Sequence, residues 1–148
     1  MEWHIKTFSE MSAVELYRLL TLRCRVFVVE QNCPYQDVDG FDEKAFQLFA
    51  VEKGIPVFSL RILPPGLTYD TAAIGRVVTD PDFRGRGLAR EGMQRALLYT
   101  CECLGYSAVK IGAQNYLRSF YESLGFKAIS EVYLEDNIPH LDMLYLHS

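Results

Sequence analysis

Arginines and glycines crowd one short segment, where a strand-like run meets a helical pattern. Gly85 and Gly87 stand among Arg84, Arg86 and Arg90. Glycine lets the backbone turn and lets a ligand approach without Cβ atoms in the way. The first amides of a helix lack partners within it, and the helix dipole adds positive potential, so an anion binds well there. In a chain of net charge −4, this segment predicts a local phosphate or pyrophosphate site.

Two well-known phosphate-binding motifs do not match this segment. A Walker loop needs Gly-Lys-Ser or Gly-Lys-Thr, which the chain lacks. The dinucleotide fingerprint Gly-x-Gly-x-x-Gly fails because Arg90 stands where its third glycine would be. The plainer alternative is a glycine-rich strand-to-helix turn whose arginines are simply exposed.

A second polar segment, residues 31–44, contains Pro34, Gly40 and four acids. We expect an ordered surface loop there. Its acids are Asp37, Asp39, Asp42 and Glu43. They form either a solvated face or part of a site that would attract a cationic amine.

The elements that position these groups follow from periodicity and capping. Ser12 and Glu15 form a capping box that begins a helical stretch over about 13–30, either continuous or broken in two. Strands are expected at 46–52, 57–63, 71–79, 107–113, 126–134 and 141–147, and helices at 87–104 and 115–124. The strand–helix–strand unit in the middle predicts a mixed α/β sheet.

Composition bounds the class of protein. The chain of 148 residues, 49% hydrophobic and 13% aromatic, predicts a single domain over 1–148 and excludes a disordered tail. No apolar run suits a membrane helix, and no signal-peptide pattern opens the chain, so we expect a cytoplasmic protein with no membrane partner. The negative charge argues against a nucleic-acid partner. The four cysteines lack metal-ligand spacing, so we expect free thiols and no metal.

Two spaced motifs resemble the GNAT (Gcn5-related N-acetyltransferase) superfamily. The pattern Arg84-x-x-Gly87-x-Ala89, preceded by Asp80-Pro81, is similar to the family's acetyl-coenzyme-A loop. Downstream, Tyr121-Glu122-Ser123-Leu124-Gly125-Phe126 resembles its Tyr-x-x-x-Gly-Phe signature. The stretches 22–35, 37–40 and 133–140 resemble the ElaA-like branch. Gln114 and Leu117 depart from the frequent Asn and Ala, which bears on contacts at the adenine end.

The resemblance implies a GNAT-type α/β fold: a mixed, mostly antiparallel central sheet of about six to seven strands flanked by about four helices. It implies an enzyme that transfers an acetyl group directly from acetyl-CoA to a primary amine, with pantetheine between the splayed strands 72–79 and 107–113. The Val77 amide would polarise the thioester carbonyl. The implied coenzyme-binding residues are Val77, Val78, Thr79, Arg84, Gly85, Arg86, Gly87, Leu88, Ala89, Arg90, Gln114, Asn115 and Tyr121.

Proton transfer requires an acid and a base. By resemblance, Tyr121 is the general acid that protonates the leaving thiolate. An amine attacks only after losing its proton, and the base candidates are His140 and Glu30, with Asp37, Asp39 and Glu135 also open. Histidine is the residue type whose ordinary pKa suits this task best, although His140 could equally open an edge strand and bond the backbone.

Residues Asp37, Asp39, Arg76 and Glu135 are candidates for acceptor binding. Arg76 either binds a substrate carboxylate or pairs with an acid. The expected acceptor is a small-molecule or protein amine, and the sequence does not distinguish the two. A homodimer through the late strands is compatible with the superfamily. Two alternatives remain: a non-catalytic acyl-CoA sensor or assembly module, and a protein-interaction domain whose glycine-rich turn is structural.

Overall fold

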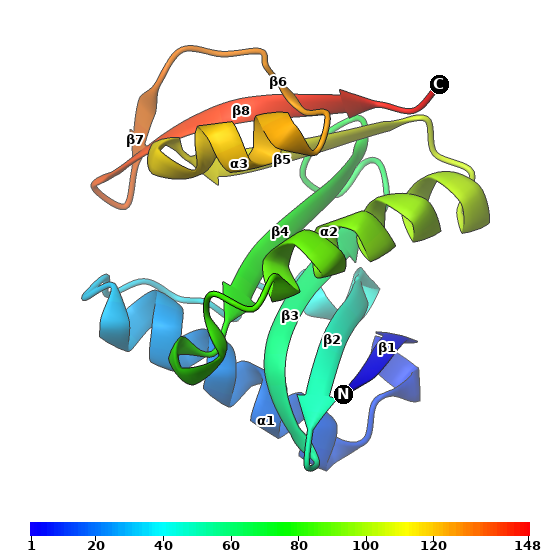
Figure 1. Ribbon diagram of the computed structural model, residues 1–148, viewed down its shortest axis with the longest axis vertical. Helices are drawn as coiled ribbons and strands as arrows, with labels where there is room; N and C mark the ends of the chain where they lie inside the picture. Colours follow the sequence, from blue (N-terminus) through cyan, green and yellow to red (C-terminus); the bar gives the residue numbers. More distant parts are fainter.

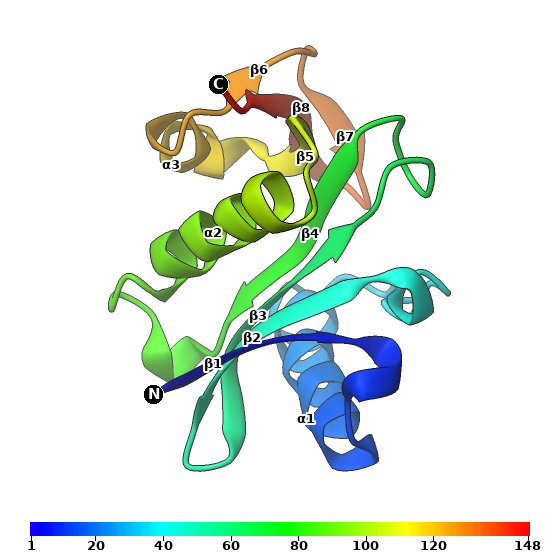
Figure 2. The ribbon, with the colours of Figure 1, turned by 90° about the vertical axis from the view of Figure 1, so that its right-hand side faces the viewer.

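A twisted sheet of eight strands runs through the computed structural model, which describes all 148 residues (Figures 1 and 2). The strands are β1 (Glu2–Thr7), β2 (Phe46–Glu52), β3 (Ile55–Leu63), β4 (Ala72–Thr79), β5 (Ala108–Gln114), β6 (Lys127–Ala128), β7 (Tyr133–Glu135) and β8 (Ile138–Leu146). Their order is β1-β2-β3-β4-β5-β8-β6, and β7 also pairs with β8. Only β4 and β5 run parallel. The expected mixed, mostly antiparallel α/β class is confirmed.

Three α-helices cover the sheet instead of the four expected. They are α1 (Ala13–Arg23), α2 (Leu88–Leu98) and α3 (Arg118–Ser123). Two helical stretches continue in π-helical geometry, α1 through Cys24–Glu30 and α2 through Tyr99–Cys103. In Figure 2, α1 and α2 lie on opposite sides of β2–β4. The Ser12–Glu15 capping box begins α1 as the sequence predicts.

The larger core lies between the sheet and α2. Phe58, Leu60 and Met93 are fully buried there. A Cβ on Gly92 would fall 2.2 Å from the Phe58 ring, so only glycine lets the middle of α2 approach the sheet this closely. A smaller cluster under α1 contains Leu22, Val26 and Val78, and it fastens α1 to the other face of β4.

The parallel strands β4 and β5 pair only at their first residues. Ala72 pairs with Val109 and Ala73 with Lys110, and the two strands then diverge, as the family resemblance implies. On the other side of β4, the register with β3 shifts after Gly75, and Arg76 adopts a left-handed conformation with φ of 51°. A bulge of this kind bends a strand and turns its next groups in a new direction.

Two sequence-based boundaries are wrong. The strand β1 was not predicted, because its six residues mix polar and apolar side chains without a clean alternation. The strand predicted over 126–134 forms only at β6 and β7. Between them the chain leaves the ladder, and the Ile129 amide and the Ser130 hydroxyl bond the backbone of Asp142 instead. These two differences raise the count from the six to seven strands expected to eight.

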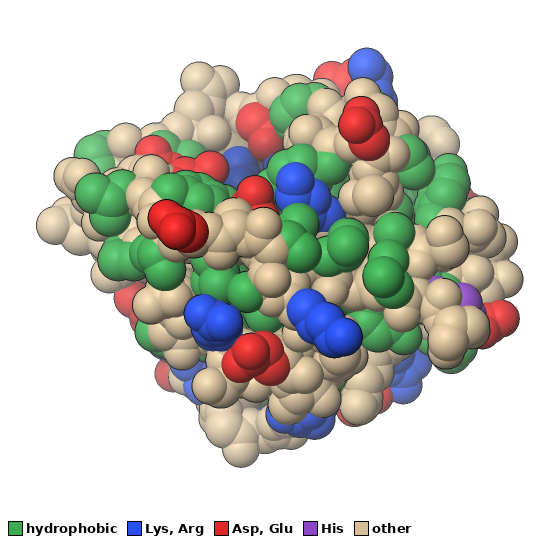
Figure 3. Space-filling model, turned by 90° about the horizontal axis from the view of Figure 1, so that it is seen from above, with side chains coloured by type: hydrophobic (Ala, Val, Ile, Leu, Met, Phe, Trp, Pro, Cys, Tyr) green, Lys and Arg blue, Asp and Glu red, His purple; other side chains and the backbone are tan.

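The end of the sheet formed by β6–β8 carries exposed apolar side chains, Val132, Leu134 and Leu146 among them. Figure 3, which views this end from above, shows apolar and charged side chains mixed on its surface. A homodimer through the late strands would bury part of this surface, and it stays a prediction. None of the helices has the length and apolar character needed to span a membrane.

Candidate functional site

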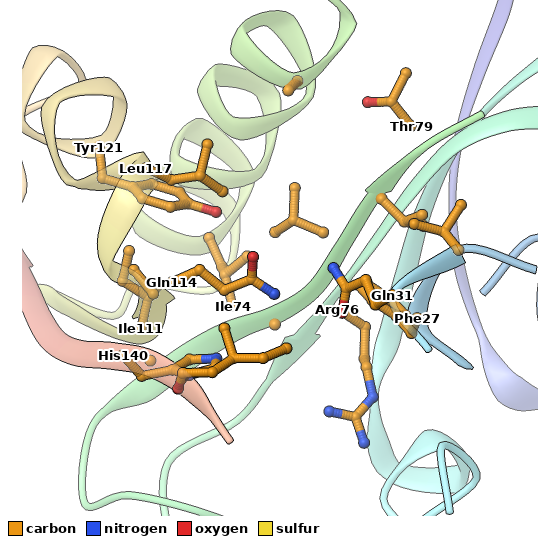
Figure 4. A pocket seen from close by; sticks show the side chains of 18 of the residues that line it. Phe27, Gln31, Ile74, Arg76, Thr79, Ile111, Gln114, Leu117, Tyr121 and His140 are labelled. Carbon is orange, nitrogen blue, oxygen red and sulfur yellow. The ribbon is translucent and has the colours of Figure 1, made fainter. Parts of the chain in front are cut away.

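A cavity of about 1110 Å³ opens where β4 and β5 separate (Figure 4). Its walls come from β4, the loop between β4 and α2, β5, α3, the π-helical turn after α1 and the β7–β8 turn. Most of the sequence-predicted residues line it. The exceptions are Arg86, Asn115 and Asp37, which lie outside the lining.

The β4–α2 loop presents open backbone to this cavity. The Asp80 carboxylate shapes the start of the loop by accepting from the Asp82 amide at 2.8 Å and from Arg25 at 2.8 Å. Gly85 and Gly87 have φ of 78° and 75°, and a Cβ on either would meet no atom within 4 Å. No side chain caps the first amides of α2, so they are free to bind an anion. The loop therefore fits a phosphate group.

The loop arginines differ in their surroundings. Arg84 makes a two-pronged ion pair with Glu30 at 2.6 and 3.0 Å, and this contact spans the rim of the cavity. Arg90 donates to the Ser123 hydroxyl at 3.0 Å and lies over the Phe120 ring. The hydrogen bond from Arg84 lowers the pKa of Glu30, which makes this carboxylate a weak base.

Tyr121 projects from α3 into the cavity (Figure 4). Its ring is only 6% exposed and packs edge-on against Phe120 and Phe126. No protein group bonds its hydroxyl. Burial raises the pKa of Tyr121 far above its usual value, so the phenol keeps its proton at neutral pH. It can donate that proton only to a strongly basic acceptor.

His140 faces the same space from β8, with Gln114 lying between it and Tyr121 in Figure 4. The Nδ1 atom lies 2.7 Å from the Ile138 carbonyl, which can only accept, so the proton of the neutral ring resides on Nδ1. The Nε2 atom is left with a lone pair, 3.6 Å from Glu135 Oε2. The ring also stacks on Tyr133. His140 thus bonds the backbone through Nδ1 and still has an unprotonated Nε2. The two alternatives that the sequence left open, a backbone contact and a base, are therefore compatible with each other.

The acidic segment is neither a solvated face nor a set of free carboxylates. Three aspartates and three arginines form a closed ring of alternating ion pairs, here called the aspartate–arginine ring. Its members in order are Arg23, Asp37, Arg76, Asp39, Arg61 and Asp42. Around the ring the contacts measure 2.8 Å (Arg23–Asp37), 2.9 Å (Asp37–Arg76), 3.2 Å (Arg76–Asp39), 2.8 Å (Asp39–Arg61), 3.2 Å (Arg61–Asp42) and 2.7 Å (Asp42–Arg23).

Most of this ring is inaccessible to water. Arg23 is 1% exposed, whereas Arg76 and Asp39 are each 24% exposed at the side chain and line the cavity. Burial alone would raise the pKa of Asp39, but hydrogen bonds from Arg61 and the Phe41 amide, together with the charges of Arg61 and Arg76, hold that pKa well below its usual value. Arg23 lowers the pKa of Asp42 in the same way against a larger burial effect. The charges balance, so the ring supplies no net negative charge to an acceptor.

Further aromatic and polar residues, none of them a sequence-predicted site residue, line the rest of this wall. Phe27, Gln31, Tyr35 and Tyr69 line the cavity beside Ile138. They come from three separate segments, residues 27–35, Tyr69 and Ile138, and no spacing in the sequence distinguishes them from ordinary surface or core residues. Only the tertiary structure brings them together.

Known proteins share this arrangement. The family model of the acetyltransferase (GNAT) domain matches residues 10–146. Protein ElaA of Escherichia coli (strain K12) is 40% identical over 145 residues, which cover 97% of this chain and 95% of ElaA. The crystal structure of Escherichia coli ElaA matches with a TM-score of 0.91 over 98% of this chain and 99% of that one.

An acyl-CoA N-acyltransferase from Pseudomonas aeruginosa is equally similar, with 41% identity and a TM-score of 0.92 over 98% of this chain and 99% of its own. The matches span both sides of the cavity, from α1 to β8, so they include the β4–α2 loop, the splayed strands and the aspartate–arginine ring. The chain belongs to the GNAT acetyltransferase family.

Proposed function

We propose that this protein is an acetyl-CoA-dependent N-acetyltransferase that transfers the acetyl group directly to a primary amine. The observation that carries the proposal is the continuous path through the cavity. It runs from the free amides at the start of α2, along the splayed edge of β4, to the hydroxyl of Tyr121 and the Nε2 atom of His140. The Pseudomonas aeruginosa relative, named as an acyl-CoA N-acyltransferase, supports the same assignment.

The coenzyme would lie along backbone groups for most of its length. The amides from Arg84 to Ala89 would hold the pyrophosphate, with Arg84 and Arg90 adding charge at close range. Pantetheine would occupy the gap beside β4 and pair with backbone groups of Val77–Thr79, because β5 has left this edge unpaired. Gln114, at the end of β5, would contact the coenzyme from the opposite wall.

The reaction then needs three proton transfers. A primary amine of ordinary pKa about 10.4 arrives protonated and must lose a proton before it attacks the thioester carbonyl. His140 Nε2 would accept that proton, directly or through a water. As the C–N bond forms and the C–S bond breaks, the Tyr121 hydroxyl would donate a proton to the departing sulfur. The second proton that the nitrogen loses as it becomes an amide would return to the Tyr121 phenolate, directly or through a water. The Val77 amide would stabilise the negative charge that develops on the carbonyl oxygen between these steps.

The acceptor side favours a compact primary amine that enters between aromatic walls. Tyr35, Phe27 and Tyr69 provide apolar contact, and the carboxylates of Glu135 and Asp136 lie at the β7–β8 turn. Since the aspartate–arginine ring is neutral, the pull on a cationic amine would come from this turn. Both small molecules and protein side chains remain within this class.

Calorimetric titration with acetyl-CoA, run beside free coenzyme A and ATP, tests the binding half of the proposal. We expect saturable one-site binding of both coenzyme forms and no binding of ATP. Arg90→Ala should weaken binding, whereas Arg95→Ala, on the same helix but outside the cavity, should not. Absence of binding at high micromolar ligand would refute the proposal.

A panel of primary amines, with release of the coenzyme thiol as the readout, tests the catalytic half. We expect at least one amine to give turnover that depends on Tyr121. Binding of acetyl-CoA without turnover of any amine would favour a non-catalytic acyl-CoA sensor instead.

A further inference from the structure

The aspartate–arginine ring connects four segments on one side of the cavity: α1, the segment between α1 and β2, β3 and β4. Arg23 comes from α1, Arg61 from β3 and Arg76 from β4, while the three aspartates come from the segment between α1 and β2. Arg76 differs from the other members because it lies at the bulge where β4 leaves its register with β3.

The backbone of Arg76 adopts a conformation that a residue with a side chain avoids. Its φ of 51° lies in the left-handed region, where glycine is the usual occupant. The neighbouring Gly75 does not have a positive φ. Strain of this kind persists only where surrounding contacts determine the conformation, and it clusters at functional sites.

Contacts at the far end of the Arg76 side chain hold its backbone in this left-handed conformation. Its guanidinium contacts the Asp37 carboxylate at 2.9 Å, the Asp37 carbonyl at 3.2 Å and the Asp39 carboxylate at 3.2 Å. It also lies over the Tyr35 ring, 5.4 Å from the centroid. Figure 4 shows the side chain leaving β4 and pointing away from Tyr121. The side chain is thus held from the acceptor side while its backbone borders the acyl site.

The residue after Arg76 is Val77, whose amide is the oxyanion donor of the proposed function. Neither residue has a partner in the register between β3 and β4, which passes from the Arg61–Gly75 pair to the Ser59–Val78 pair. The ladder therefore does not set the direction of the Val77 amide. The conformation of Arg76 does.

We propose that Arg76 is a positioning residue for acyl transfer: the aspartate–arginine ring holds it in the left-handed conformation and so directs the Val77 amide at the thioester carbonyl. This inference rests on the proposed function. It assigns the buried charges of the acceptor wall a role in the chemistry, since a loosened ring would turn the donor away from the carbonyl oxygen without removing the coenzyme site.

A vibrational measurement reads this role without an identified acceptor. Acetyl-CoA labelled with ¹³C at its thioester carbonyl is bound to the full-length protein, and the isotope-edited infrared band is compared with that of the free compound. Polarisation by an amide donor lowers the carbonyl stretching frequency, so the wild-type protein should give a downshifted band. Calorimetry on the same samples reports coenzyme affinity.

Three variants separate the ring from the backbone. Arg76→Ala removes the side chain and keeps the strained position, so it should lose most of the downshift. Arg76→Gly should retain more of it, because glycine accepts the left-handed conformation. Asp39→Asn loosens two ring contacts at a partly exposed residue, so it should fold and lose part of the downshift. Arg95→Ala, an arginine with its own carboxylate partner and its own aromatic contact outside the cavity, is the matched control.

The outcomes are distinct. Acetyl-CoA that binds all variants with affinities within about threefold of one another, with a downshift that falls in the stated order, supports the proposal. A full downshift in Arg76→Ala and Asp39→Asn overturns it, and Asp39→Asn alone decides if Arg76→Ala does not fold. A wild-type protein that binds acetyl-CoA with no downshift removes the oxyanion role of Val77 and this inference with it. A protein that binds no acetyl-CoA refutes the proposed function itself.

Discussion

The two sides of the cavity are built in different ways. The loop proposed to hold the coenzyme phosphates is one continuous stretch, residues 79–90, whose glycines and free amides face open space and whose arginines are largely exposed. The acceptor wall is assembled from four segments joined by buried charges, with Arg23 at 1% exposure. Its ion pairs connect residues between 14 and 39 positions apart in the chain.

This difference predicts different responses to substitution. A change on the coenzyme side alters affinity, because the groups involved carry little of the fold. A change in the aspartate–arginine ring leaves a buried charge without its partner, which is strongly destabilising even though such pairs add little net stability compared with apolar residues. The following predictions test this contrast, from the largest expected effect to the smallest.

Arg23→Met should give the largest effect, a loss of about 3–5 kcal/mol in the free energy of unfolding. It leaves the carboxylates of Asp37 and Asp42 buried without one of their arginine partners. Urea unfolding followed by circular dichroism measures this loss. Arg95→Ala, which removes an exposed ion pair, should lose less than about 1 kcal/mol. Equal losses of unfolding free energy in the two variants would contradict the claim that the buried ring, unlike an exposed ion pair, supports the fold.

Tyr121→Phe should lower kcat by about 100-fold to 1000-fold with the amine that the panel identifies. The change removes only a hydroxyl that bonds no protein group, so acetyl-CoA affinity and the unfolding midpoint should be unchanged. Steady-state thiol release measures kcat. Tyr145→Phe, which packs on the other side of Phe126 outside the cavity, serves as the control. An unchanged kcat in Tyr121→Phe would exclude this phenol as the acid.

His140→Gln should lower kcat by about 100-fold and flatten the acid limb of its pH profile. The amide keeps a polar side chain at this place but cannot take up a proton. Measurement of kcat from pH 5.5 to 9 distinguishes the base from a residue that only bonds the Ile138 carbonyl. A profile that keeps its acid limb would move the role of base to another group.

Acid should lower the free energy of unfolding by breaking the ion pairs of the aspartate–arginine ring. The pKa values of Asp39 and Asp42 are lowered in the folded protein, so the unfolded chain takes up protons at a higher pH than the folded one. Their contribution is therefore complete above the ordinary aspartate pKa of about 3.9 and is lost progressively as the pH falls below it. Urea midpoints measured between pH 6 and 2.5 should drop over this range. Asp39→Asn should show a smaller drop, and an equal drop would contradict the assignment.

Glu30→Gln should give the smallest effect, a gain of about twofold to fivefold in acetyl-CoA affinity. The Glu30 carboxylate accepts two hydrogen bonds from the Arg84 guanidinium, and an incoming pyrophosphate would compete with it for these donors. Calorimetry at low salt measures the gain, and added salt should reduce it. Glu91→Gln, which frees an arginine outside the cavity, should leave affinity unchanged. Weaker binding in Glu30→Gln would instead show that the Glu30–Arg84 pair holds the loop ready.

Several features of the protein follow from local sequence alone. The capping box at Ser12, the strand-to-helix loop around Gly85 and Gly87, and the order of the central elements all depend on interactions within a few residues. Helix starts and tight turns are set by backbone amides and left-handed glycines, which neighbouring residues determine. The boundaries that were wrong, at β1 and between β6 and β7, belong to strands whose pairing partners lie far along the chain.

The acceptor side was decided only by the tertiary structure. Four acids in a loop are compatible with a solvated face, and it is the approach of Arg23, Arg61 and Arg76 that pairs three of them, two of which are buried. The free nitrogen of His140 likewise depends on where β8 places the ring relative to the Ile138 carbonyl. Local sequence determines which groups are available, whereas long-range packing determines which of them are desolvated, and desolvation sets the strength of every charge they carry.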